Sequence, residues 1–346
     1  MHDRGPILVT GGTGSLATFC IARLLSEGYT VRTTVRSSAR RAEVVEAVAR
    51  LDSSGGAGRV EFVEADLTRD AGWADVMRGA AGVLHVASPF PSTPPKSDDE
   101  IVRPARDGAL RVLAAARDAG VARVVMTSST AAVAYGRGGR PTPFDESDWS
   151  DETNRSDSNA YERSKTIAER AAWEWLGREG GALELTTVNP GAILGPIAGR
   201  DISTSINIVK TLLDGSIAGL ARFGWPLADV RDIADLHVRA LKAPAAAGQR
   251  YIGAGPFFWL SDIAEVLRSR VPHLARRVPQ RSFPNWVVRA TGRFNPVIKH
   301  RLFELDVRRP VSADKAKREL GWTPRSNEDA IVATATSLAA AGLVRA

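Results

Sequence analysis

The sequence predicts an α/β protein with a doubly wound parallel sheet and a smaller C-terminal lobe. Three observations support this fold class. Up to residue 190, short Val-rich segments alternate with helical segments. The Val-rich segments are almost continuously apolar, as strands are when helices cover both faces of a sheet. A glycine-rich turn follows the first of them, at the edge where such sheets bind ligands.

The predicted elements follow one another in regular order. We expect strands at residues 6–10, 30–36, 60–66, 82–87, 122–129 and 182–188. We expect helices from the first turn to about 27, at 40–51 and 73–78, in a longer stretch ending at 119, and at 160–177 and 230–241. Past Gly191 the alternation weakens, which indicates the smaller lobe. The predicted first domain is therefore 1–190, rejoined by 229–243, and the lobe is 191–228 with 244–346.

Composition excludes several classes of protein. With 44% hydrophobic residues the chain can build a sizeable core, and it has no apolar run of about 18 residues that could span a membrane. Charged Asp3 and Arg4 lead directly into a strand, which leaves no room for a signal peptide, so we expect a cytoplasmic protein. Cys20 is the one cysteine and is expected to be buried. The five histidines lack metal-site spacings, so no metal is expected.

Positive charge is concentrated in residues 268–309. This segment holds eleven Lys or Arg against two acids, a balance of 11 − 2 = +9, and the rest of the chain holds 35 basic and 37 acidic residues, or −2. Phe283, Trp286 and Phe294 lie among these cations, so a surface for nucleic acid or an anionic membrane is one interpretation. A solvated basic face is the commoner outcome. We therefore expect neither nucleic acid nor a membrane as a partner.

The glycine turn has the spacing of a dinucleotide-binding site. Gly11, Gly14 and Ala17 follow the GxxGxxA pattern between the first strand and the first helix. Gly11 permits the tight turn, Gly14 lets the backbone approach a diphosphate, and Ala17 keeps the helix close to its strand. The alternative is a structural glycine turn, but the βαβ context favours a Rossmann-type cofactor domain. The residues expected to bind the diphosphate side are Thr10, Gly11, Thr13, Gly14, Ser15 and Leu16.

The end of the second predicted strand indicates NADP rather than NAD. Arg36 stands where NAD-specific proteins usually place an acid that binds ribose hydroxyls. A guanidinium binds the 2′-phosphate of NADP through charge-assisted hydrogen bonds. The alternative is a solvated basic turn. Asp66 is expected either to accept from the adenine amino group or to cap the following turn, and His85 to be a packed strand residue. The other expected cofactor residues at strand ends are Leu67, Ala87, Ser88, Pro190 and Ile193.

A possible catalytic group follows the fifth predicted strand. Tyr161 and Lys165 lie four residues apart, and therefore on one face of a predicted helix. A nearby positive charge lowers the pKa of a phenol, about 10 when free, toward a value suited to proton transfer. Ser129 ends its strand at the same edge of the sheet and is expected to hold a substrate oxygen. Tyr161 could also be an ordinary core residue, but the ordered combination with the glycine turn argues against this.

These motifs resemble the extended short-chain dehydrogenase/reductase family, in its dihydroflavonol reductase, cinnamoyl-CoA reductase and methylglyoxal/aldehyde reductase branch. The matching segments are TGGTGSLA, TVRTTVR, ADL, HVASP, VVMTSS, YERSK, NPGAILGP, VRDIADLHVRAL and LGWTP. The resemblance implies that Ser129, Tyr161 and Lys165 are catalytic, with Tyr161 and Lys165 also contacting the cofactor, and that Arg36 reads the NADP phosphate. The NWYCYGK element of cinnamoyl-CoA reductases is replaced by SNAYERSK. The resemblance therefore does not imply that cinnamoyl-CoA is the substrate.

The implied activity is NADPH-dependent reduction of a ketone or aldehyde. The substrate is expected to lie between the catalytic residues, the proline-rich loop at 88–95 and the lobe, against Phe90, Thr130, Phe223 and Trp225. Alternatives are a nucleotide-sugar epimerase or dehydratase, a hydroxysteroid-type dehydrogenase, and an NADP-binding sensor or nucleic-acid-associated protein. The expected partner is a small carbonyl compound, and the protein is expected to be a monomer or homodimer.

Overall fold

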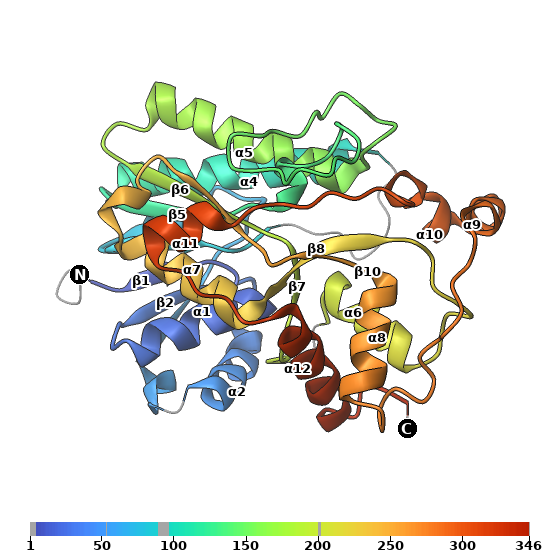
Figure 1. Cartoon of the computed structure of the whole chain (residues 1–346). Coiled ribbons are helices and arrows are strands. Elements are labelled where there is room, and N and C mark those ends of the chain that lie inside the picture. The colour runs from blue at the N-terminus through green and yellow to red at the C-terminus, as the bar shows by residue number, and fades with distance from the viewer. Residues whose placement is uncertain (1–4, 53, 89–96, 200–201, 346) are drawn as a thin grey trace.

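The structure is a computed structural model, and it describes residues 5–52, 54–88, 97–199 and 202–345. Its centre is a parallel sheet of seven strands in the order β3-β2-β1-β4-β5-β6-β9 (Figure 1). This confirms the predicted doubly wound fold. The strands are β1 (Ile7–Val9), β2 (Val31–Val35), β3 (Val60–Glu64), β4 (Gly82–His85), β5 (Arg123–Thr127), β6 (Glu184–Pro190) and β9 (Arg250–Gly253).

Helices cover both faces of this sheet. One face carries α1 (Ser15–Ser26), α2 (Arg41–Leu51) and α7 (Val230–Lys242), and the other carries α3 (Trp73–Met77), α4 (Asp99–Asp118) and α5 (Ala160–Glu179). Successive side chains of a strand point to opposite faces. Ile7 and Val9 of β1 accordingly pack into the core beside α1, and Leu8 packs into the core beside α4. A strand buried on both sides has to be apolar throughout, which explains the continuous apolar runs.

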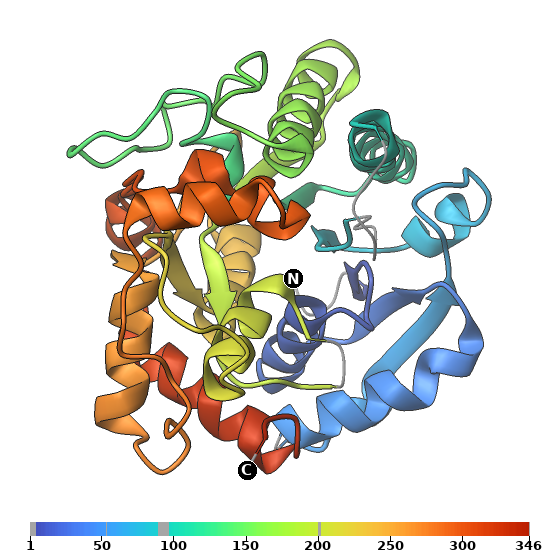
Figure 2. The same ribbon diagram turned by 90° about the vertical axis from the view of Figure 1, so that its right-hand side faces the viewer.

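A second sheet begins after β6. It has the order β10-β8-β7, with β7 (Ala192–Leu194), β8 (Gly224–Asp229) and β10 (Phe257–Trp259). Helices α6 (Thr204–Leu213), α8 (Leu260–Arg270) and α12 (Asn327–Ala340) bury a separate apolar core against it. Helices α9 (Asn285–Gly292) and α10 (Pro296–Lys299) lie at the right-hand edge of Figure 1, and this edge faces the viewer in Figure 2.

The chain returns twice from the C-terminal half to the central sheet. Helix α7 packs against α1, and β9 hydrogen-bonds to β6 through Thr187–Pro190. Strand β9 lies within the range that the sequence assigned to the lobe, so 250–253 are part of the central sheet instead. A strand this short, between the turn at 244–249 and the pair Gly255 and Pro256, has too little periodicity to be assigned from sequence. Helix α11 (Asp314–Leu320) and Trp322 also pack beneath α7.

Short 3₁₀ helices complete the chain at Ser38–Arg40 (η2), Gly56–Arg59 (η3), Thr130–Ala132 (η4), Pro244–Ala246 (η5) and Leu302–Glu304 (η6). Among the helices that the structure describes, none combines the length and the apolar character needed to cross a bilayer.

Candidate active site

The glycine turn between β1 and α1 leaves the start of α1 open to a ligand. Gly11 has φ 74°, a backbone conformation that favours glycine, and a Cβ there would lie 2.9 Å from Cβ of Ala87. Gly14 is the N-cap residue of α1, and no side chain caps the helix. The first amide groups of α1 can therefore donate to an anion, as the glycine spacing requires. Thr13, Ser15 and Leu16 are partly exposed around this turn.

Thr10 joins the ends of β1 and β4 beneath the turn. Its hydroxyl accepts from the backbone N–H groups of Val86 (3.1 Å) and Ala87 (3.0 Å) and lies 2.9 Å from Nδ1 of His85. Since the hydroxyl has one proton, it donates to Nδ1, and the neutral imidazole carries its proton on Nε2. Burial, followed by the charge of Lys165, lowers the pKa of His85 to about 3. His85 is therefore a neutral packed residue.

Two arginines stand beside the turn. Arg36 is exposed directly after β2. Arg40 donates to the hydroxyl of Thr13 (3.3 Å) and pairs with Glu43 (2.8 Å). Arg40 follows Arg36 by four residues in the sequence. The ion pair and this hydrogen bond hold its guanidinium against the glycine turn.

Asp66 and Leu67 are positioned by local contacts. The carboxylate of Asp66 accepts from the N–H and from the hydroxyl of Thr68, both at 2.8 Å, and these bonds lower its pKa. Leu67 is partly buried, and its carbonyl accepts from Arg111. Of the two roles expected for Asp66, turn capping is the one seen among the described contacts.

Helix α5 carries Tyr161 and Lys165 on the side that faces the cavity of the site. The helix starts at a capping box, in which the N–H of Tyr161 donates to Asn159 (2.7 Å) and the N–H of Asn159 donates to Glu162 (2.9 Å). This fixes the register of the helix. Nζ of Lys165 lies 5.9 Å from the ring centroid of Tyr161 and donates to the hydroxyl of Ser88 (3.1 Å).

Ser129 completes the group at the end of β5. Its hydroxyl accepts from the N–H of Ala131 (3.1 Å) and also hydrogen-bonds with Tyr161. Burial raises the pKa of Tyr161, and the bond to Ser129 opposes this rise. Burial lowers the pKa of Lys165 to about 8, opposed by the negative charge of Glu169. Of the three residues that the sequence selected, Tyr161 is thus hydrogen-bonded to Ser129 and lies beside Lys165.

A buried carboxylate lies one turn beyond Lys165 and was not identified from the sequence. Glu169 pairs with Nε of Arg250 (2.7 Å) and accepts from Nδ2 of Asn189 (2.7 Å) and from Ser128. Its side chain is fully buried. The detectable signal was its position four residues after Lys165, on the same helix face.

The site opens into a cavity of about 700 Å³. Ser129, Tyr161 and Lys165 line it, together with Ser88, Pro190 and Ile193 of the expected cofactor residues and Thr130 and Trp225 of the expected substrate residues. Phe223 does not line it, because its side chain packs into a small core with Val288 and Leu305. This corrects the expectation for Phe223. It precedes β8, which begins at Gly224, so the strand does not fix its side chain on the face that Trp225 shares with the cavity. Phe90 lies outside the described residues.

The lobe adds a charged wall to the cavity that the sequence did not reveal. Glu304 is buried and accepts from Tyr135 (3.2 Å), from Nε1 of Trp225 (3.0 Å) and from Arg301 (3.0 Å). Burial, followed by the negative charge of Glu304, raises the pKa of Glu162 to about 7. The lobe therefore holds the pKa of the Glu162 carboxyl above its usual range.

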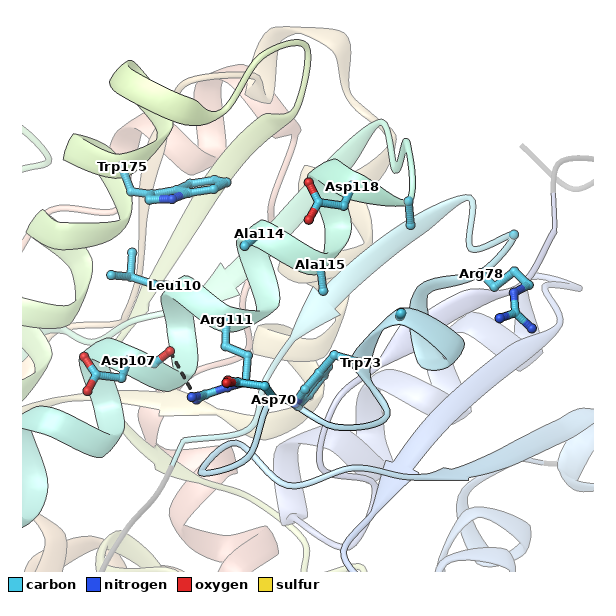
Figure 3. A pocket seen from close by; sticks show the side chains of 13 residues that line it. Asp70, Trp73, Arg78, Asp107, Leu110, Arg111, Ala114, Ala115, Asp118 and Trp175 are labelled. Carbon is cyan, nitrogen blue, oxygen red and sulfur yellow. Dashed lines mark hydrogen bonds and ion pairs between the residues drawn. The ribbon is translucent and has the colours of Figure 1, made fainter.

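A second concavity of about 760 Å³ lies between α3, α4 and α5, away from the catalytic residues. Figure 3 shows Trp73, Leu110 and Trp175 along it, with Arg111 beside Asp70. Its charged groups all take part in ion pairs, either with one another, as Arg111 does with Asp70, or with a neighbour in the chain. None of the expected site residues lines it. Within the described residues, no cluster of His, Cys, Asp or Glu could hold a metal ion.

The fold and the relatives' reductase activities together indicate an NADP-dependent oxidoreductase. The chain belongs to the NAD dependent epimerase/dehydratase family, whose family model matches residues 7–253. This confirms the resemblance to extended short-chain dehydrogenases/reductases.

Two relatives and one solved structure illustrate the match. Cinnamoyl-CoA reductase CAD2 of Medicago truncatula is 34% identical over 275 residues, covering 78% of this chain and 81% of that protein. Dihydroflavonol 4-reductase of Zea mays is 32% identical over 288 residues, covering 82% and 78%. The crystal structure of yeast methylglyoxal/isovaleraldehyde reductase Gre2 complexed with NADPH matches with a TM-score of 0.80 and 26% identity, covering 98% of this chain and 100% of that one.

Proposed function

We propose that this protein is an NADPH-dependent reductase that converts a ketone or aldehyde into an alcohol, with Tyr161 as the proton donor. The observation that carries the proposal is the convergence of Ser129, Tyr161 and Lys165 on one cavity. The relatives that are named reductases, and the NADPH bound in the Gre2 structure, support the choice of reaction and cofactor.

Each part of the site has a separate task in this reaction. The turn from Thr10 to Leu16 binds the diphosphate, and Arg36 with Arg40 binds the 2′-phosphate. NADPH, when bound, supplies the hydride. Ser129 holds the carbonyl oxygen, and Tyr161 protonates that oxygen as negative charge develops on it. Lys165 holds the nicotinamide ribose and provides the positive charge that makes the phenol a better acid.

The family name leaves a nucleotide-sugar epimerase or dehydratase as the competing function. Such an enzyme would use the same tyrosine and lysine with tightly held NAD. Arg36 and Arg40, beside the glycine turn, favour the phosphorylated cofactor. Oxidation of an alcohol, as in hydroxysteroid-type dehydrogenases, is the same chemistry in the opposite direction.

The test is to mix the purified protein with NADPH or NADH and aryl ketones, aldehydes, diketones and flavanonols, and to follow the nicotinamide absorbance. We expect NADPH to be oxidised in the presence of a carbonyl substrate. The rate should be about 10²- to 10⁴-fold lower in Tyr161→Phe, because general acid catalysis contributes about this much. NADPH binding by the variant, measured by fluorescence, should be retained. Full activity of Tyr161→Phe would refute the proton-donor role. Copurified NAD without reduction would favour the epimerase or dehydratase.

A further inference from the structure

The segment that contains α9 and α10 carries most of the exposed apolar side chains of the described structure. Trp286 is 72% exposed, Phe294 90% and Val297 69%. Among the other large hydrophobic residues that the structure describes, only Val45 is exposed, at 38%. We define the α9–α10 surface by Trp286, Arg289, Arg293, Phe294, Val297 and Lys299, all of which are exposed.

The outward direction of this surface is set by packing. Trp286, Arg289 and Arg293 follow the i, i+3, i+7 spacing of one helix face. Val288 and Gly292 are buried on the opposite face, and Val288 packs with Phe223 and Leu305. The inner side of α9 is therefore held by the lobe, which leaves the tryptophan and the two arginines directed outward together.

The cations of this surface lack acidic partners. Nearby Arg268 pairs with Glu265, and Arg301 pairs with Glu304. Within the part of the chain that the structure describes, Arg289, Arg293 and Lys299 form no ion pair. Residues 268–309 contain only Glu304 and Asp306 as acids. Asp306 pairs with Arg222. The positive charge of the α9–α10 surface is thus not neutralised by its own chain.

We propose that the α9–α10 surface docks on an anionic phospholipid membrane. Aromatic and aliphatic side chains beside unpaired Arg and Lys are the composition of peripheral helices that insert an apolar face at the headgroup level. A solvated basic face, expected from the sequence, accounts for the cations but not for three exposed apolar side chains within residues 286–297. Nucleic acid is less suited, because Val297 offers no ring for base stacking.

The same surface adjoins the mouth of the active site. His300 and Arg301 follow α10 directly and line the 700 Å³ cavity. Docking through α9 and α10, which lie at the edge that faces the viewer in Figure 2, would hold the cavity close to the lipid. The proposal does not depend on the reaction catalysed, since its test measures binding alone.

The experiment is cosedimentation of the full chain with vesicles of phosphatidylcholine and phosphatidylserine, compared with vesicles of phosphatidylcholine alone. We expect binding to the anionic vesicles that weakens as salt rises, because salt screens exposed charges. In Arg289→Gln/Arg293→Gln the partition coefficient should fall roughly 25-fold, since each cation near the surface contributes about fivefold. Trp286→Ser/Phe294→Ser should also bind less at unchanged charge.

A matched control removes the same charge elsewhere. Arg178 lies in the last turn of α5 and Arg69 follows β3, and both are exposed. Arg69→Gln/Arg178→Gln should keep the binding of the original chain. The thermal midpoint of every variant should stay unchanged, because the substituted side chains are exposed.

Three outcomes would overturn the proposal. The first is equal binding by the Arg289/Arg293 and Arg69/Arg178 variants. The second is no binding to anionic vesicles together with retention of a single-stranded oligonucleotide that the α9–α10 variants lose, which would assign the surface to nucleic acid. The third is a dimer, measured by sedimentation velocity, that the Trp286/Phe294 variant alone dissociates, without any vesicle binding; this would assign the surface to a second copy of the chain.

Discussion

Lys165 and Tyr161 experience opposite effects of the same burial. Removal from water lowers the pKa of the ammonium to about 8 and raises the pKa of the phenol. Glu169 opposes the first effect, and the hydrogen bond to Ser129 opposes the second. At neutral pH the site therefore holds a charged lysine beside a protonated tyrosine, which is the state that reduction of a carbonyl requires.

The pH dependence of reduction follows from these directions. Lys165 is charged below pH 8 and loses its proton above it, whereas Tyr161 stays protonated over this range. We expect kcat/KM for NADPH-dependent reduction to be highest below pH 8 and to fall as pH rises through about 8. Lys165→Arg keeps its charge and should show lower but nearly constant activity over the same range. An unchanged decline in Lys165→Arg would assign the titration to another group.

Arg36 is the residue on which cofactor choice depends in the proposed function. A charge-assisted bond contributes about 1.5–3 kcal/mol, or a factor of roughly ten to one hundred in affinity. Arg36→Gln should therefore raise KM for NADPH by about this factor and change KM for NADH little, as measured in steady-state kinetics. The control is Arg178→Gln, at the far end of α5, which should change neither constant. Equal increases for both cofactors would contradict the role in phosphate binding.

At the scale of elements, the link between α5 and β9 supports the catalytic helix. Glu169 of α5 and Arg250 of β9 form an ion pair whose side chains are 0% and 9% exposed. Their Nε–Oε1 distance is 2.7 Å. Because Glu169 also accepts from Asn189 of β6, the carboxylate joins the helix to the two neighbouring strands beneath Lys165.

Loss of one partner should cost more stability than loss of both. Glu169→Leu leaves a buried unpaired guanidinium and should lower the free energy of unfolding by about 3–5 kcal/mol. In Glu169→Leu/Arg250→Leu the loss should be clearly smaller than the sum of the two single variants, as measured by urea denaturation. Arg50→Ala, which breaks an exposed pair with Glu46, should have little effect. Strict additivity would show that the two side chains act independently.

At the scale of the whole molecule, the C-terminal residues fasten the lobe to the cofactor domain. Trp322 is 1% exposed and packs in the core beneath α7. Its Nε1 donates to the carbonyl of Asp232 (2.9 Å). The N–H of Arg325 donates to the carboxylate of the same aspartate (2.7 Å). The segment after α11 is therefore part of the packing that joins the lobe to α7.

Two tryptophans provide a matched comparison of this role. Trp322→Ala should lower the free energy of unfolding by about 3–5 kcal/mol, because it opens a cavity in a packed core. Trp286→Ala removes a side chain that is 72% exposed and should change stability little. Both values follow from thermal or denaturant unfolding. A loss in Trp286→Ala as large as that in Trp322→Ala would mean that α9 contributes to the core more than its exposure indicates.

The sequence by itself determined the features that depend on local spacing. The strand and helix alternation up to β6 follows from continuous apolar runs separated by helical segments. The glycine turn follows from the GxxGxxA spacing, and the placing of Tyr161 and Lys165 on one helix face follows from their spacing of four residues. Arg36 and Ser129 could be selected because each stands at the carboxyl end of a predicted strand, which is where a parallel sheet binds its ligand.

The tertiary structure decided what long-range packing controls. Strand β9 joins β6 across the chain, Arg250 reaches Glu169, and Arg301 with Glu304 enters the cavity from the lobe. Phe223 turned into the lobe core, although Trp225, two residues on, lines the site. Such contacts join residues far apart in the chain, and no local pattern encodes which of them meet. The outward direction of the α9–α10 surface also depends on long-range packing, because the burial of Val288 against the lobe turns Trp286 outward.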